Sequence, residues 1–233
     1  MSFPKHIQTF IDNRDEVKRL VNIHIRIAGT ASGRKNNEAQ VLNKSAVVLL
    51  VACWESYIET IVSDAFDFML ANAETHDVFP NTVLTKSAKG LRDDKDERKI
   101  WLIADSGWRK VLTKYKENSF KKEIDYFHVP RPANIDELFD KLIGLGNLSK
   151  TWTWKGQNNS DTIKTLNELI DLRGNIAHKI KIDDSIRKQD VLYYLNFINN
   201  LTVATNNVVA KYVEKRVGQK PWEIMVYKVQ RKF

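Results

Sequence analysis

The chain has 233 residues, 42% of them hydrophobic and 28% charged, an ordinary balance for a globular protein with a sizeable core. Its net charge of +8 favours a polyanionic partner, although charge alone indicates neither sequence readout nor catalysis. The single cysteine, Cys53, excludes an internal disulfide and indicates a reducing compartment.

The first predicted helix runs from about Pro4 to Ala28. A proline in the first turn and apolar residues spaced three and four apart support it. The preceding start, MSFPKHIQTF, has no apolar core of the signal-peptide type. Together with the lone cysteine, this predicts a cytoplasmic protein.

The second predicted helix, from about Glu38 to Ala73, is apolar on all sides near its middle, which is typical of a central buried helix. Its longest apolar run, nine residues from Ala46 to Trp54, is shorter than the about 20 of a membrane span, so no membrane partner is expected. Glu55 and Glu59 follow, one turn apart on one face. They are either solvated helix charges, or one of them meets a buried arginine of another helix.

Residues 76–133 are less periodic and form a predicted insertion. Residues 85–99, TKSAKGLRDDKDERK, are expected to be an exposed loop, and residues 100–116 a helix or a helix pair broken near Gly107. The next helix follows two prolines, with Asn134 and Glu137 in capping-box spacing, and ends at Gly144 or Gly146.

Two further helices complete the predicted fold. Ser160 or Asp161 caps a helix that includes LNELIDLRGNIAHK, and the segment KIDDS caps a last helix from Ile186 to about Arg216. A short strand or an extended tail follows. The prediction is an all-α fold in one domain, residues 1–217, with an irregular insertion at 76–133 and a basic C-terminal tail at 218–233.

Arg173 and His178 are the most informative residues of the chain. Arg173 falls within the apolar stripe of its helix, and a guanidinium there must find a carboxylate, a phosphate or a subunit boundary. His178 lies at the helix end, where its imidazole can reach solvent and substrate. The structural alternative is that His178 complements the helix dipole and Arg173 forms a structural ion pair.

Other chemistries have little support. The five histidines are scattered, with neither a cysteine pair nor a His-x-x-x-His spacing, so no metal site is expected. Cys53 lies in an apolar helix that should keep it a thiol, and no glycine-rich loop has the spacing that cradles phosphate. We therefore expect no metal and no cofactor.

The chain resembles the HEPN superfamily, in particular its RiboL-PSP branch and a related defence-associated branch. Three segments carry the resemblance: the buried helix VVLLVACWESYIETIVSDAF, the segment NIDELFDKLIGLG and the helix LNELIDLRGNIAHK. The motif of that superfamily is an arginine, four to six residues, then a histidine, usually with a polar residue after the arginine. Here Gly174 follows Arg173, and the amide comes one position later, as Asn175.

The resemblance implies an HEPN-like helical bundle of four to five core helices that forms a homodimer in which the two motifs face one another. It also implies, for many members, a metal-independent endoribonuclease that acts as a toxin or antiphage effector, with an antitoxin or defence-system partner. It implies that Arg173 and His178 are catalytic, with Asn175 as the polar residue. An imidazole can carry protons and a guanidinium can hold phosphoryl charge, so the expected products are a 2′,3′-cyclic phosphate and a 5′-OH. A catalytically inactive dimerisation or nucleic-acid-binding module is the alternative, and an unrelated helical adaptor a third reading.

Several residues are expected to support such a site. Glu55 is a carboxylate for Arg173, and Lys179 is either a phosphate contact or a plain helix-end cation. Trp152 and Trp154 either stack on unpaired bases or pack on the core. The basic tail, with Lys228 and Arg231, either follows an RNA backbone or is simply solvated.

Overall fold

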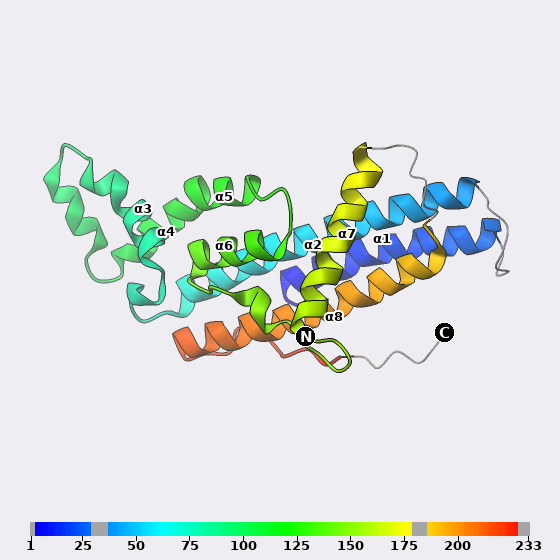
Figure 1. The fold of residues 1–233 in the computed structure, drawn as a ribbon. Coiled ribbons are helices and arrows are strands. Elements are labelled where there is room, and N and C mark those ends of the chain that lie inside the picture. Colours follow the sequence, from blue (N-terminus) through cyan, green and yellow to red (C-terminus); the bar gives the residue numbers. More distant parts are fainter. Residues whose placement is uncertain (1–2, 29–36, 179–185, 228–233) are drawn as a thin grey trace.

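The computed structural model describes residues 3–28, 37–178 and 186–227, and these residues form an all-helical fold (Figure 1). The helices are α1 (Lys5–Ala28), α2 (Asn37–Asn72), α3 (Asn81–Arg92), α4 (Gly107–Tyr115), α5 (Lys121–Asp125), α6 (Pro132–Ile143), α7 (Asn159–His178) and α8 (Lys188–Val217). Short 3₁₀ segments lie at His76–Val78, Glu97–Ile103 and Leu148–Thr151, and a π turn lies at Lys116–Phe120. The described part of the chain contains no strand beyond an isolated bridge between Trp154 and Gln157. The predicted all-α class is confirmed.

The long helix α2 is the centre of the core. Its large side chains Trp54, Tyr57 and Phe66 are fully buried, and α1, α7 and α8 pack around it. Among the described residues, α2 alone is long and apolar enough to cross a membrane, a test that the buried core helix of a globular protein also passes. The prediction of a central buried helix is therefore confirmed.

Cys53 lies on the side of α2 that faces α1. Its side chain is 2% exposed, and its Sγ lies 3.7 Å from the carbonyl oxygen of Phe10. Burial raises the pKa of the Cys53 thiol to about 12, because the thiolate would lose its hydration there. Cys53 is thus a buried, unreactive thiol, as expected from its apolar neighbours.

A buried polar group, which we call the His6 cluster, consists of His6, Asp64, Asn206 and Trp222. The fully buried His6 ring has its Nδ1 2.7 Å from Asp64 Oδ2 on α2 and its Nε2 3.1 Å from Asn206 Oδ1 on α8. The Trp222 ring packs on it at 4.5 Å between centroids. The cluster therefore joins α1, α2, α8 and the segment that follows α8.

The segment after α8 is extended and is held by hydrogen bonds to α8. The backbone N–H of Met225 donates to Asn207 Oδ1, and Asn207 Nδ2 donates to the Met225 carbonyl. Of the two predicted forms, a strand or an extended tail, the structure has the extended tail over residues 219–227.

Some predicted local structures differ from those observed. Residues 85–92, expected in a loop, belong to α3, whose first turn buries Val83. The helix ends at Arg92, just before the aspartates at positions 93, 94 and 96. The helix α6 begins at Pro132, whose fixed φ suits the first helical position, so Asn134 lies inside the helix and donates to the Val129 carbonyl instead of forming a capping box. Its C-terminal cap is Gly144, at a φ of 78°, as expected.

The start of α7 also differs from the prediction. The side chain of Asn158 accepts a hydrogen bond from the backbone N–H of Asp161, so Asn158 is the cap and the predicted caps, Ser160 and Asp161, lie in the first turn. The segment KIDDS lies outside the described residues, and α8 begins at Lys188.

Candidate functional site

Helix α7 lies across α2 and carries the predicted site residues in its last two turns (Figure 1). Leu166, Leu169 and Ile170 are buried and fix the middle of the helix on the core. The last two turns are more open. Asn175 and His178 are exposed there, and Arg173 is half-buried on the side of the helix that faces α2.

Arg173 meets a carboxylate of α2, as one of the two readings of the glutamate pair predicted. Arg173 Nη2 lies 3.8 Å from Glu55 Oε2, with the side chains 33% and 19% exposed. At this distance the two groups form an ion pair rather than a hydrogen bond. Among the described residues the guanidinium thus has one counter-charge and no hydrogen bond, so its N–H groups can still donate to another anion.

Arg173 and His128 both influence the Glu55 carboxyl. Burial raises its pKa, whereas the charge of Arg173, and to a smaller extent the electrostatic effect of His128, lowers it. Glu59, one turn further along α2, has no such cation: burial, together with the charges of Glu55 and Asp125, raises its pKa to about 7. The floor of the site thus holds one carboxylate paired with Arg173 and one whose pKa is raised to about 7.

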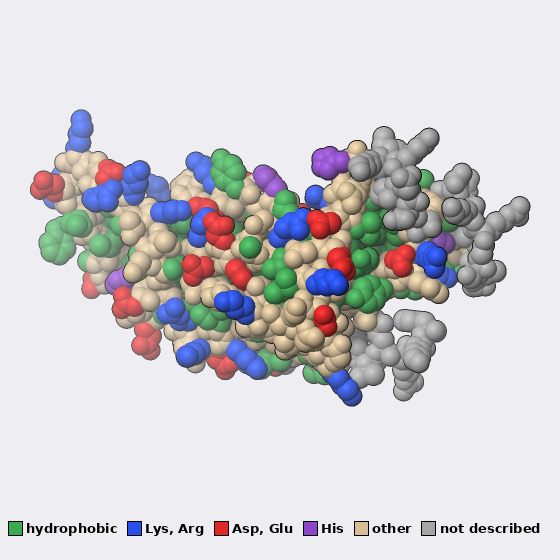
Figure 2. Space-filling view, in the orientation of Figure 1, with side chains coloured by type: hydrophobic (Ala, Val, Ile, Leu, Met, Phe, Trp, Pro, Cys, Tyr) green, Lys and Arg blue, Asp and Glu red, His purple; other side chains and the backbone are tan. Residues whose placement is uncertain are grey.

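The loop before α6 forms the opposite side of the site. Its His128 is exposed. Arg131 Nη2 lies 2.5 Å from Asp171 Oδ1 on α7, and Arg131 Nη1 donates to Asn167 Oδ1 at 3.3 Å. These contacts hold the loop against α7. Figure 2 shows the surface hollowed between α5 and the free end of α7, with histidine and basic side chains on both sides. We call this hollow the α7 notch.

The end of α7 is open toward solvent. Among the described residues, the side chains of Asn175 and His178 make no hydrogen bond or ion pair, with Arg173 or with any other residue. Gly174 has nothing within 4 Å of the place where a Cβ would lie, so the position next to Arg173 has room for a side chain. Lys179, Lys228 and Arg231 lie outside the described residues.

Of the two alternatives for Trp152, base stacking or packing on the core, the structure shows packing, because this side chain is fully buried. Its ring packs edge-on against Trp54 at 6.1 Å between centroids. Trp154 is half-buried and packs between Phe197 and Tyr227. The first tryptophan therefore belongs to the core, and the second is mainly a packing residue.

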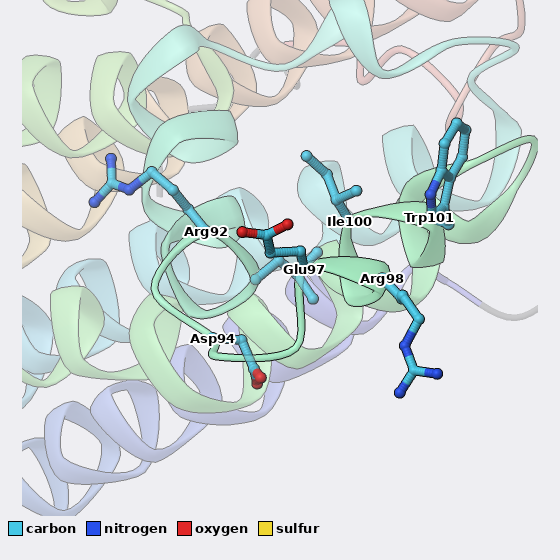
Figure 3. Close-up of a pocket in the computed structure, with 7 residues that line it drawn as sticks. Arg92, Asp94, Glu97, Arg98, Ile100 and Trp101 are labelled. Carbon is cyan, nitrogen blue, oxygen red and sulfur yellow. The ribbon is translucent and has the colours of Figure 1, made fainter.

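Two shallow pockets lie away from α7. One of about 540 Å³ is formed by the insertion, around the 3₁₀ segment Glu97–Ile103. Figure 3 shows that its charged side chains Arg92, Asp94 and Arg98 point in different directions rather than toward one another. Within the described ranges, no group of three or more histidine, cysteine or acidic side chains could hold a metal ion.

The fold and these residues define a class of protein: an all-helical bundle with an arginine, four residues and a histidine at the end of a helix that packs on a buried central helix. Residues 9–211 match the RiboL-PSP-HEPN family, and the chain belongs to this family. No match is found among curated proteins or among solved structures. Membership points to an RNA-related role, since HEPN domains are often ribonucleases, although some are inactive.

Sequence reasoning missed the second side of the site. His128 and Arg131 come from the loop after the insertion, and neither showed a motif. The only available signal was Arg131 between two prolines, which fix the backbone of the loop.

The raised pKa of Glu59 predicts a pH-dependent stability. In the unfolded chain Glu59 loses its proton near pH 4.5, whereas in the folded protein it keeps the proton until about pH 7. Between these values the folded state binds more protons, so the free energy of unfolding should fall as pH rises through this window. Glu59→Gln should remove that loss and be more stable than wild type by roughly 1–2 kcal/mol at pH 8, with little difference at pH 4.

Urea unfolding of wild type and Glu59→Gln at a series of pH values measures this effect. The control is Glu137→Gln, because Glu137 is exposed and its pKa is lowered by Lys141. A stability difference between wild type and Glu59→Gln that stays constant from pH 4 to pH 8 would contradict the prediction.

Proposed function

We propose that this protein is a metal-independent endoribonuclease of HEPN type that cleaves RNA at a site formed by Arg173 and His178. The observation that carries the proposal is the arrangement at the end of α7. A half-buried arginine keeps free donors beside a single carboxylate, and an exposed histidine follows one turn later with no competing partner among the described residues. Family membership adds an RNA-related role to this arrangement.

The proposed chemistry needs no metal. His178 takes the proton of the ribose 2′-OH, the 2′-oxygen attacks the adjacent phosphorus, and Arg173 stabilises the charge that builds on the phosphoryl oxygens. Asn175 orients a phosphate oxygen or the 2′-OH. The 5′-oxygen then leaves, and the products are a 2′,3′-cyclic phosphate and a 5′-OH. DNA is not cleaved, because it lacks the nucleophile.

The proposal includes the setting of this activity. Two copies of the chain place their α7 ends at a shared site, and the protein acts in the cytoplasm as a toxin or antiphage effector, away from membranes. An antitoxin or another defence protein is the proposed regulator. The net charge of +8 supports binding to RNA, whose backbone is a polyanion.

A second candidate is an inactive RNA-binding or dimerisation module of the same family. Two observations favour it. Arg173 already has a counter-charge in Glu55, and Gly174 provides no polar side chain after the arginine. Cleavage, rather than binding, separates the two candidates.

The test is a cleavage assay of the full chain with mixed RNA in EDTA, followed by end-group analysis. Wild type should produce cyclic phosphates, and His178→Ala should lower the rate by at least about 10²-fold, the usual contribution of a general base. His76→Ala is the matched control, because His76 is exposed in a 3₁₀ segment beyond α2. Intact RNA with a folded wild-type protein would favour the inactive module.

A further inference from the structure

We propose that Arg131 is a positioning residue of the RNA-cleaving site: it holds the last two turns of α7, which carry Arg173 and His178, in the orientation that cleavage requires. This role rests on the proposed function and extends it, because Arg131 lies outside the arginine–histidine motif, in the loop before α6. Arg131 acts through its contacts with Asp171 and Asn167 of α7 and not by touching the substrate.

The last two turns of α7 have little hydrophobic support. The buried side chains of this helix end at Ile170, and every residue from Asp171 to His178 is half-buried or exposed. Loosely packed helix ends open most readily. The orientation of these turns therefore depends on their polar contacts as well as on the partly buried Leu172 and Ile176.

Two polar contacts fasten these turns from opposite sides. Arg173 pairs with Glu55 at 3.8 Å, and Asp171 pairs with Arg131. Asp171 and Arg173 are two residues apart, so they point about 200° apart around the helix. Among the described residues, no other side-chain hydrogen bond or ion pair reaches positions 171–178.

The two contacts do not have the same fate in the proposed reaction. Arg173 must give up Glu55, at least in part, to bind the phosphate of the substrate. The contact between Arg131 and Asp171 involves no residue of the motif, so it can persist while RNA is bound. Arg131 is therefore the polar anchor that holds the end of α7 during cleavage.

The backbone of Arg131 gives this anchor a rigid base. The neighbouring Pro130 and Pro132 are buried, and Pro132 begins α6. The backbone N–H of Arg131 donates to the Val129 carbonyl at 2.8 Å, and its own carbonyl accepts from the N–H of Ile135 at 3.0 Å. The side chain thus starts from a fixed position at the beginning of α6.

The guanidinium of Arg131 contacts two positions of α7. Its Nη2 lies 2.5 Å from Asp171 Oδ1, and its Nη1 donates to Asn167 Oδ1 at 3.3 Å. Asn167 and Asp171 are one turn apart, and the same side of the helix continues to Asn175 and His178. A contact that spans one turn opposes rotation of the helix about its axis, and this rotation decides where the motif side chains point.

The expected effect is modest because the ion pair is partly exposed. The side chains of Arg131 and Asp171 are 39% and 60% exposed. Such a pair shifts the balance between a docked and an open helix end by about two- to fivefold. Loss of Arg131 should therefore loosen the end of α7 and leave the rest of the fold unchanged.

The experiment measures hydrogen exchange of the backbone amides and single-turnover RNA cleavage on the same full-length proteins. We expect Arg131→Ala to speed exchange at residues 174–178 by about two- to fivefold and to leave exchange in α2 unchanged. The maximal cleavage rate should fall, by up to about fivefold, at a nearly constant half-saturating RNA concentration. Lys86→Ala is the matched control, because Lys86 pairs with Glu123 between α3 and α5.

A charge exchange separates positioning from direct RNA binding. Arg131→Glu places two carboxylates opposite each other, so it should open the end of α7 and slow cleavage. Adding Asp171→Arg to the same chain restores an ion pair of reversed direction and should recover most of the protection and of the maximal rate. An arginine that bound RNA would instead affect the half-saturating RNA concentration and would not be replaced by this exchange.

The other outcomes are distinguishable. Unchanged exchange at residues 174–178 in Arg131→Ala would overturn the positioning role and leave the proposed function intact. Faster exchange with an unchanged maximal rate would overturn it as well, because the orientation of the helix end would then not limit cleavage. A folded wild type that cleaves no RNA would remove the proposed function, and the positioning role with it.

Discussion

Arg173→Ala is expected to lower RNA cleavage by about 10²–10³-fold while the protein stays folded, because the substitution removes the cation that stabilises the phosphoryl charge in the transition state. The stability cost should be small, about 1 kcal/mol or less, since the Arg173–Glu55 pair is partly exposed and 3.8 Å long. Arg173→Lys should retain only part of the activity. The ammonium of lysine is a point charge, whereas the planar guanidinium of arginine can donate two parallel hydrogen bonds to a phosphate.

Single-turnover cleavage rates and thermal melting measure the two parts of this prediction. Arg92→Ala is the control, since Arg92 is exposed in α3 and pairs with its neighbour Asp93. Glu55→Gln adds a second comparison: it keeps the shape of the side chain but frees Arg173 of its counter-charge. Unchanged cleavage by Arg173→Ala would contradict the proposed role.

Trp152→Ala is expected to destabilise the protein by about 3–5 kcal/mol, because it leaves a large cavity beside Trp54 in the core. RNA binding should fall only in step with the folded fraction, since a fully buried ring cannot stack on a base. Trp152→Phe should cost much less, because the Trp152 Nε1 has no hydrogen-bond partner to lose within the described residues.

Urea unfolding and RNA binding, measured at a concentration of urea where both proteins are folded, separate the two roles. Trp101→Ala is the surface control: Trp101 is 76% exposed, so its replacement should change the stability by about 0.5 kcal/mol or less. A Trp152→Ala protein as stable as wild type but deficient in RNA binding would contradict the packing role of Trp152.

The parts of the site that follow from one helix were predictable. The periodicity of α7 places Arg173 in an apolar stripe, and burial then requires a partner, which Glu55 provides. The contributions of His128 and Arg131 were not predictable, because they depend on how the irregular insertion returns the chain to α7. The periodicity of apolar residues within a helix does not show where the chain lies after an irregular segment.

The same distinction applies to the fold. The central helix α2 could be predicted because a continuous run of apolar residues indicates a helix that is buried on all sides. The loop expected at residues 85–92 is helical because Val83 docks the start of α3 on the core, a tertiary contact that outweighs the polar composition. The caps of α6 and α7 moved by a few residues, since neighbouring asparagine, aspartate and proline residues compete for the same positions.

The His6 cluster has a consequence for the order in which the protein is made. His6 and Asp64 leave the ribosome early, whereas Asn206 and Trp222 are added about 200 and 216 residues after His6. During synthesis, Asp64 is therefore the only member of the cluster available to His6 at first, and the other members arrive after α7, with Arg173 and His178, has already been added. Completion of the bundle is thus delayed beyond synthesis of the proposed catalytic helix, which limits how early a nascent chain can act on the RNA around it.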